Sequence, residues 1–172
     1  MSRAPRGFTL IECLACLALL AVVTTLGVPA WGSLAGAARV SGAMHRLTSD
    51  LAIARSSAIR GNVAHIACAG SPSTGCQAGG WEPGWIVFAD RNGNRRADPG
   101  EIVAEAGPLH AIAIVATRTQ VRYLPDGRSP HANLSLRICR AGALRGEVVV
   151  NNTGRVRSRR LDGTTACPGT SP

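Results

Sequence analysis

The sequence predicts an α+β protein in which a long N-terminal helix packs on a C-terminal β-rich head of two small antiparallel sheets. An apolar run from Phe8 to Trp31 is continued by an amphipathic pattern that reaches Arg60. Beyond Arg60 the chain breaks into short strand-like runs separated by turns. Its 172 residues fit one domain with an appended segment, and 45% of them are hydrophobic, which excludes a disordered chain.

The first predicted element is a membrane-spanning helix over residues 8–31. Apart from two thiols, Glu12 is the only ionisable side chain in this run, which exceeds the about 20 residues that cross a bilayer. The leader before it, residues 1–7, carries two arginines. Because positive charge before a first span keeps that end in the cytoplasm, the rest of the chain is expected to be exported.

An amphipathic continuation is predicted over residues 32–60. Its apolar residues recur at alternating spacings of three and four, which is the period of a helix that packs one face on a core. Gly61 and Asn62 supply the stop signal. The predicted apolar stripe consists of Val40, Met44, Leu47, Leu51, Ala54 and Ala58.

The predicted head covers residues 61–167, and the tail 168–172 is expected to be frayed. Leu134, Leu136 and Ile138 alternate with polar residues, as in a half-buried strand. The strands are expected at residues 63–68, 85–90, 111–116, 121–124, 133–139 and 147–151.

Four of the six cysteines lie in the exported part, where disulfides persist. Three connectivities are possible. We expect Cys68–Cys76, which closes a short Gly/Ser/Pro loop, and Cys139–Cys167, which ties the C-terminal tail to a sheet. A zinc site is the alternative, but the usual closely spaced cysteine pairs are missing.

The N-terminus allows three interpretations: a secretory signal, a lipoprotein signal or a pilin leader. The segment Gly7-Phe8-Thr9-Leu10-Ile11-Glu12 resembles the class III leader of type IV pilins and type II secretion pseudopilins. The resemblance implies that a prepilin peptidase cuts between Gly7 and Phe8 and methylates Phe8. It also implies an inner-membrane protein, anchored in lipid with its head in the periplasm, that later enters a pilus or pseudopilus.

Glu12 is the residue for which this resemblance implies a role in filament assembly. A carboxylate within a span costs ~2.5–3.5 kcal/mol on insertion scales, so it normally has a partner. Cleavage would create an ammonium at Phe8, which Glu12 of a neighbouring subunit can meet. The alternative is a glutamate that snorkels to the membrane interface.

Two further segments resemble the FimT/GspH group. These are WEPGWIVFADRNGNRRADPGE, residues 81–101, and Gly154-Arg155-Val156-Arg157, which matches the G-R-x-R motif of FimT-type minor pilins. A FimT-like protein would be a type IV minor pilin that binds extracellular DNA for natural transformation. A GspH-like one would be a pseudopilin, or a minor pilin, that primes filament assembly without a nucleic-acid ligand.

Positive charge is concentrated in the C-terminal third. The formal net charge is +9, all 19 basic residues are arginine, and the only acid between residues 137 and 160 is Glu147. Arginines at alternate positions of a strand would stand in a row ~6.6–7 Å apart, near the phosphate spacing of one DNA strand. The alternative is a solvated basic face. The predicted contacts to double-stranded DNA are Arg137, Arg140, Gly154, Arg155, Arg157, Arg159 and Arg160.

The loop from Asp90 to Glu101 has oxygen-bearing side chains at the spacing of an EF-hand. Its sixth position is Arg95 where glycine is usual, and three arginines reduce its attraction for a dication. We therefore predict a polar hairpin with Asx turns and no metal. The histidines are scattered and no nucleophile motif or P-loop occurs, so neither an enzyme nor a cofactor is expected.

Overall fold

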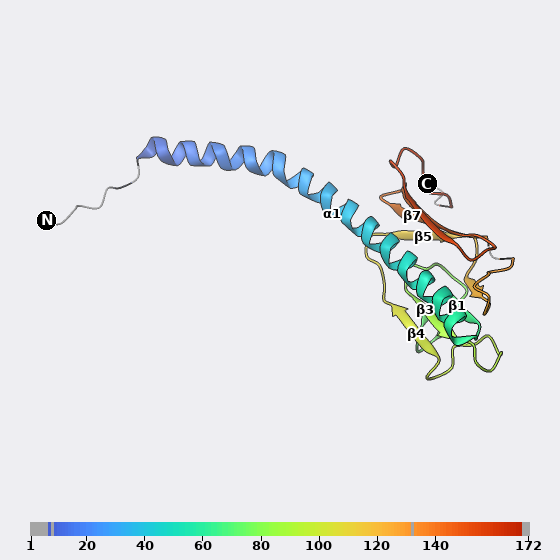
Figure 1. Ribbon diagram of the computed structural model, residues 1–172. Helices are drawn as coiled ribbons and strands as arrows, with labels where there is room; N and C mark the ends of the chain where they lie inside the picture. The colour runs from blue at the N-terminus through green and yellow to red at the C-terminus, as the bar shows by residue number, and fades with distance from the viewer. Residues whose placement is uncertain (1–6, 8, 132, 170–172) are drawn as a thin grey trace. The chain divides into compact units, whose positions relative to one another are not determined.

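The computed structural model describes residues 7, 9–131 and 133–169, without the side chains of residues 26–30. It divides into two units, Met1–Ala38 and Arg39–Pro172. Helix α1 runs over Leu10–Gly61, so it contributes to both units (Figure 1). In the first unit, the large apolar side chains that the structure describes are exposed, Leu10 and Trp31 among them. An exposed apolar surface of this kind indicates a segment that contacts lipid or other subunits.

The second unit contains two antiparallel sheets. The first has the order β2-β1-β3-β4, with β6 also paired to β1, and the second has the order β5-β7-β8-β9. All the strand pairs are antiparallel, as expected for a chain of short hairpin-linked strands. The strands are β1 (His65–Ser71), β2 (Gly75–Cys76), β3 (Trp85–Ala89), β4 (Ile102–Ala106), β5 (Ala113–Ala116), β6 (Gln120–Tyr123), β7 (Leu134–Arg140), β8 (Ala143–Val150) and β9 (Val156–Arg160).

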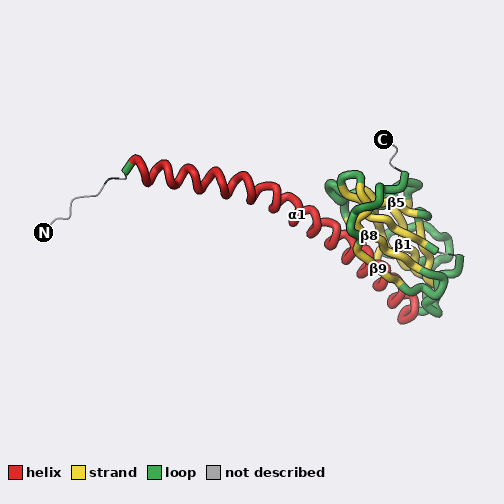
Figure 2. Tube along the Cα trace, turned by 90° about the horizontal axis from the view of Figure 1, so that it is seen from above, coloured by secondary structure: helices red, strands yellow, loops and turns green. Residues whose placement is uncertain are grey.

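The main core lies where the C-terminal half of α1 packs on both sheets (Figures 1 and 2). All six residues of the predicted helical stripe are buried there, which confirms the amphipathic continuation. From the sheets, Trp85, Val87, Leu136 and Val148 join the same cluster. The Asp50 carboxylate is buried in it and accepts a hydrogen bond from the Trp85 indole Nε1 at 2.9 Å.

A smaller core covers the other face of the first sheet. Ile66, Ile86 and Phe88 form it, and Ala97 from the loop between β3 and β4 packs against it. Because β1 and β3 are thus buried on both faces, their sequences read as continuous apolar runs rather than as alternating patterns.

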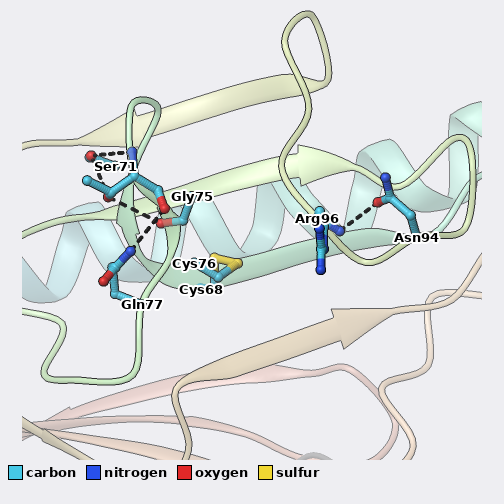
Figure 3. Close-up of a disulfide and its surroundings, with 8 residues drawn as sticks. Cys68, Ser71, Gly75, Cys76, Gln77, Asn94 and Arg96 are labelled. Atoms are coloured by element: carbon cyan, nitrogen blue, oxygen red, sulfur yellow. Dashed lines mark hydrogen bonds between the residues drawn. A yellow bond between two sulfur atoms is a disulfide. The ribbon is translucent and has the colours of Figure 1, made fainter.

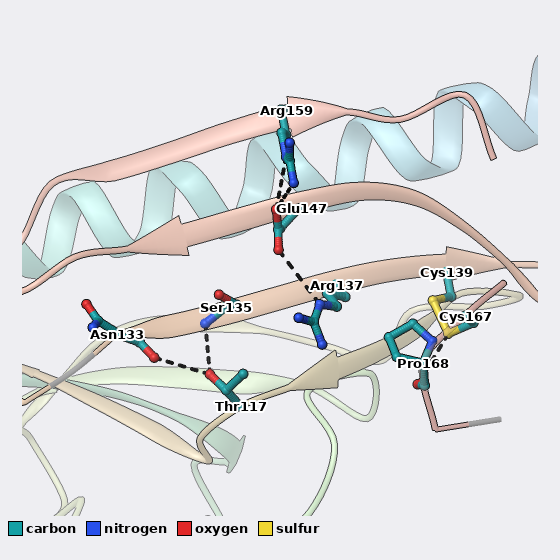
Figure 4. Close-up of polar contacts among 9 residues, drawn as sticks. All are labelled: Thr117, Asn133, Ser135, Arg137, Cys139, Glu147, Arg159, Cys167 and Pro168. Carbon is teal, nitrogen blue, oxygen red and sulfur yellow. Dashed lines mark hydrogen bonds and ion pairs between the residues drawn. A yellow bond between two sulfur atoms is a disulfide. The ribbon is translucent and has the colours of Figure 1, made fainter. Parts of the chain in front are cut away.

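Both expected disulfides are present. Cys68 is bonded to Cys76 (Figure 3), and Cys139 to Cys167 (Figure 4), with Cα–Cα distances of 5.5 and 5.8 Å. The second bridge holds the C-terminal segment against β7 and β8, where the amide of Cys167 donates to the carbonyl of Gly142 at 2.8 Å. In the chain-entropy model a loop of this length contributes ~3–4 kcal/mol to stability.

The α+β prediction is confirmed. Three of the nine described strands, β2, β4 and β9, lie outside the expected ranges, and β9 was considered only as a condition for the row of arginines. β2 is only two residues long. The Ser-Pro-Ser-Thr segment directly before it has the composition of a turn, so no strand is predicted there. β4 has the sequence IVAEA, whose alternate residues Val103 and Glu105 are exposed. Because Val103 is apolar yet exposed, apolar and polar residues do not alternate clearly over these five residues.

Candidate functional site

Strand β9 lies at the edge of the second sheet, and its arginines do not all face the same side. Arg157 pairs with Val149 and Arg159 with Glu147, whereas Val156 and Ser158 pair with the core residues Val150 and Val148. Arg157 and Arg159 therefore point outward, away from the core, and both are exposed. Arg155, just before the strand, is also exposed. The row expected if residues 155–160 form a strand therefore holds within β9 for Arg157 and Arg159, whereas Arg155 precedes the strand.

Glu147 neutralises part of this surface. It lies between Arg137 on β7 and Arg159 on β9, in one row across three strands (Figure 4). Its carboxylate accepts the Arg159 Nη2 at 2.9 Å and lies 3.7 Å from the Arg137 Nε. Two of the seven arginines between residues 137 and 160 thus share Glu147, the one acid of that stretch. The Arg137–Glu147–Arg159 row carries a net charge of +1, so Arg155 and Arg157 dominate the outward charge.

Arg160 and Arg140 are placed differently from this row. Arg160 pairs with the buried Gly146, and its guanidinium donates a hydrogen bond to the hydroxyl of Ser41 on α1. It therefore faces the helix and not the surface that carries Arg157 and Arg159. Arg140 is half-buried at the end of β7, beyond the position of Arg137. The structure therefore does not bring Arg160 into the outward row.

Gly154 is buried and shapes the turn before β9. It has a φ of +75°, and a Cβ at this position would overlap the carbonyl oxygen of Gly127. Arg55 on α1 holds the two turns together: its Nε donates to the carbonyl of Gly127 at 3.0 Å, and its Nη2 donates to the carbonyl of Thr153 at 3.3 Å. The Gly154 amide donates to Asn151 at 2.8 Å, so it is not available to a ligand. Gly154 therefore shapes the turn that leads into β9.

The first turn of α1 contains a capping box that sequence reasoning missed. One carboxylate oxygen of Glu12 accepts hydrogen bonds from both the amide and the hydroxyl of Thr9, each at 2.9 Å. The Thr9 hydroxyl in turn accepts a bond from the Glu12 amide at 3.4 Å. The signal was present as Thr-x-x-Glu before an apolar run. Gly7 is exposed, whereas Phe8 lies outside the described residues.

Within the part of the chain that the structure describes, no helix combines the length and the hydropathy needed to cross a membrane. The membrane span predicted for residues 8–31 is therefore not confirmed by this measure.

The loop between β3 and β4 adopts the predicted Asx turns. The amide of Asn94 donates to the Asn92 Oδ1 at 3.0 Å, and the amide of Arg96 donates to the Asn94 Oδ1 at 2.7 Å (Figure 3). The side-chain amides of Asn92 and Asn94 both donate to Asp98, at 2.8 and 2.6 Å. The bond from Asn92, and after it that from Asn94, lowers the pKa of Asp98 from its usual range. Among the described residues, no group of three or more His, Cys, Asp and Glu side chains could hold a metal ion.

A long apolar-faced helix packed on two antiparallel sheets, with a basic edge strand and a capped N-terminal glutamate, defines a pilin-like subunit. The model for the type II transport protein GspH matches residues 43–154, more than half of the chain. The chain therefore belongs to the GspH family. A second model, the prokaryotic N-terminal methylation motif, matches residues 2–28.

Two crystal structures of the type IV minor pilin FimU from Pseudomonas aeruginosa share this fold. The TM-scores are 0.54 and 0.53 at 15% sequence identity in both cases. The matches cover 75% and 74% of this chain and 92% and 97% of the respective FimU chains. A comparison with curated proteins gives no significant match. The chain is therefore a GspH-family protein that carries a prokaryotic N-terminal methylation motif and shares the fold of a minor pilin.

Proposed function

We propose that this chain is a FimT-like minor pilin whose head binds double-stranded DNA without sequence preference, through Arg155, Arg157 and Arg159. The observation that carries the proposal is the outward row of arginines on edge strand β9. Guanidinium groups suit phosphate because they offer several donors in a planar fork. Because phosphate contacts position a protein on DNA without reading its sequence, the interaction would be with the phosphate backbone.

The row also has a structural alternative. Charged side chains on an edge strand prevent edge-to-edge pairing, and β9 is such an edge. In that case the arginines would serve solubility and the chain would act as a GspH-like subunit that primes filament assembly without binding DNA. The match to the GspH model favours this second candidate. DNA uptake in natural transformation follows only if the head binds DNA.

The DNA proposal predicts weaker binding when outward arginines are removed. It predicts tighter binding when Glu147, which pairs with two arginines, is neutralised. Fluorescence anisotropy of a short labelled duplex is measured with the full-length chain in a neutral detergent over a salt series. The wild-type Kd is expected at ~10⁻⁴–10⁻⁶ M at physiological salt, with a steep salt dependence. Arg155→Ala with Arg157→Ala should weaken binding at least about tenfold and reduce the log–log salt slope by about 1.8. Glu147→Gln should tighten binding because it releases Arg137 and Arg159 from their shared acid.

The matched control is Arg39→Ala with Arg60→Ala, two exposed arginines of α1 that change the net charge equally. If this pair weakens binding as much as the β9 pair does, only bulk charge is at work and the proposed interface is wrong. Absence of any binding by the wild-type chain at about 50 mM salt would leave the assembly role as the function.

A further inference from the structure

The loop between β3 and β4 contains two buried carboxylates that are only partly satisfied. Asp90 and Glu101 are 5% and 6% exposed. One oxygen of each accepts a loop amide: Asp90 Oδ1 from Arg95 and Glu101 Oε1 from Arg91, both at 3.0 Å. Since these amides belong to the loop itself, both carboxylates face its interior. The second oxygens, Asp90 Oδ2 and Glu101 Oε2, are buried without a hydrogen-bond partner.

Buried ionised oxygens without partners are costly, so a compensating cation is expected. Arg122 is a poor candidate for that cation. Its Nη2 lies 3.8 Å from the Asp90 Oδ2, beyond hydrogen-bond distance, and its own Nε is buried and unpartnered. No ion pair reaches Glu101 among the described residues. The site is therefore short of positive charge at the centre of the loop.

We propose that this loop binds a calcium ion. The ligands would all be oxygen atoms at the first, third, fifth, seventh and twelfth loop positions, with the ninth acting directly or through water. They are supplied by the side chains of Asp90, Asn92, Asn94 and Glu101, the backbone carbonyl of Arg96, and Asp98 at the ninth position. The inference is independent of the DNA proposal and reverses the expectation, drawn from Arg95, that the loop holds no metal.

The backbone removes the objection that the sixth position is not glycine. Arg95 has a φ of +60°, which is the left-handed conformation for which glycine is usually required there. Its amide donates to Asp90 Oδ1, and the Asx turns at Asn92 and Asn94 fix the backbone on either side of it. The Arg95 side chain lines a neighbouring pocket with Arg118 and Arg122.

The donor set selects calcium over other ions. Calcium accepts six to eight oxygen ligands, including amide and backbone carbonyls, whereas zinc prefers nitrogen and sulfur. Among the described residues, no three His, Cys, Asp or Glu side chains are placed to hold a metal ion together, so Asp98 would act through water while Asp90 and Glu101 bind directly. Nearby arginines weaken the attraction, so the expected Kd is ~10⁻⁴–10⁻³ M, the range of extracellular calcium modules.

Calcium binding is tested on the full-length chain in neutral detergent, stripped with a chelator and titrated with calcium chloride by calorimetry. We expect one site per chain. The melting temperature, followed by fluorescence of the buried Trp81 and Trp85, should rise by roughly 4–10 °C at about 10 mM calcium. Magnesium at the same concentration should raise it less, because magnesium demands a stricter octahedral geometry.

Two variants separate calcium binding from a purely structural role of the loop. Glu101→Gln should abolish the calcium-dependent rise, whereas Glu105→Gln, an exposed control on β4, should keep it. Asn92→Asp should tighten binding several-fold, because it adds a charged ligand without disturbing the buried carboxylates. A wild-type chain that shows neither binding heat nor a melting shift at about 10 mM calcium would overturn the proposal. So would a full calcium response in Glu101→Gln, or equal responses to magnesium and calcium.

Discussion

Gly154→Ala is expected to destabilise the head by about 2–5 kcal/mol. Two effects add up at this position. The residue has a left-handed φ of +75°, which costs an alanine ~1–2 kcal/mol, and the added Cβ would overlap the carbonyl of Gly127. That carbonyl cannot simply move away, because Arg55 holds it from α1 at 3.0 Å. Thermal or denaturant unfolding of the full-length chain, followed by tryptophan fluorescence, measures the loss.

Gly142→Ala is the matched control for this substitution. Gly142 has almost the same φ, +73°, but a Cβ there would meet nothing within 4 Å. Only the backbone strain remains, partly offset by the lower entropy of the unfolded chain, so a cost of about 1 kcal/mol is expected. Equal losses in the two variants would mean that the close approach of the turns at Gly127 and Gly154 contributes nothing to stability.

Glu12→Gln is expected to leave the helix capped and the leader cleaved, and to reduce incorporation into filaments about 10–100-fold. Glutamine can still accept the hydrogen bonds that Thr9 now donates, because either residue completes a capping box. What it loses is the negative charge that we propose meets the Phe8 ammonium of a neighbouring subunit. A hydrogen bond to a charged group contributes ~1.5–3 kcal/mol, which corresponds to that loss. Immunoblots of sheared filaments against total membranes measure it.

Thr9→Ala, which loses the helix cap and keeps the charge, is the control for Glu12→Gln. It removes the hydroxyl that caps the helix but keeps the charge of Glu12, so incorporation is expected to stay close to that of the wild-type chain. If Thr9→Ala impairs incorporation and Glu12→Gln does not, the glutamate acts through the cap and the charge-pair account is wrong.

Much of the head was predictable because it depends on local patterns. The helical stripe, the alternation in β7 and the Cys68–Cys76 bridge each follow from spacing within a short segment, whereas the Cys139–Cys167 bridge joins residues 28 positions apart. The second sheet's register, by contrast, decides that Arg160 faces Ser41 while Arg159 meets Glu147. A one-residue step along a strand changes the face, and the sequence alone does not show which partner lies opposite.

Contacts between distant segments were the hardest to predict. Arg55 is one of four arginines on α1, yet it joins turns 72 and 98 residues further along the chain. The loop after β3 shows the same limit. Its oxygen spacing was visible, but the left-handed Arg95 and the burial of Glu101 were not. The many polar residues of this loop predicted a solvated hairpin. In the structure the loop packs against the smaller core through Ala97, and its Asp90 and Glu101 side chains are buried.

The mass of the N-terminal peptide of the membrane-extracted chain tests most directly whether this is a processed pilin-like subunit. The family and motif matches and the leader before Phe8 predict a chain that begins at Phe8 and carries a methyl group on its amine. A chain that begins at Trp31 would indicate ordinary secretion, and one that keeps Met1 would show that the leader is not cut. Either result would contradict the account.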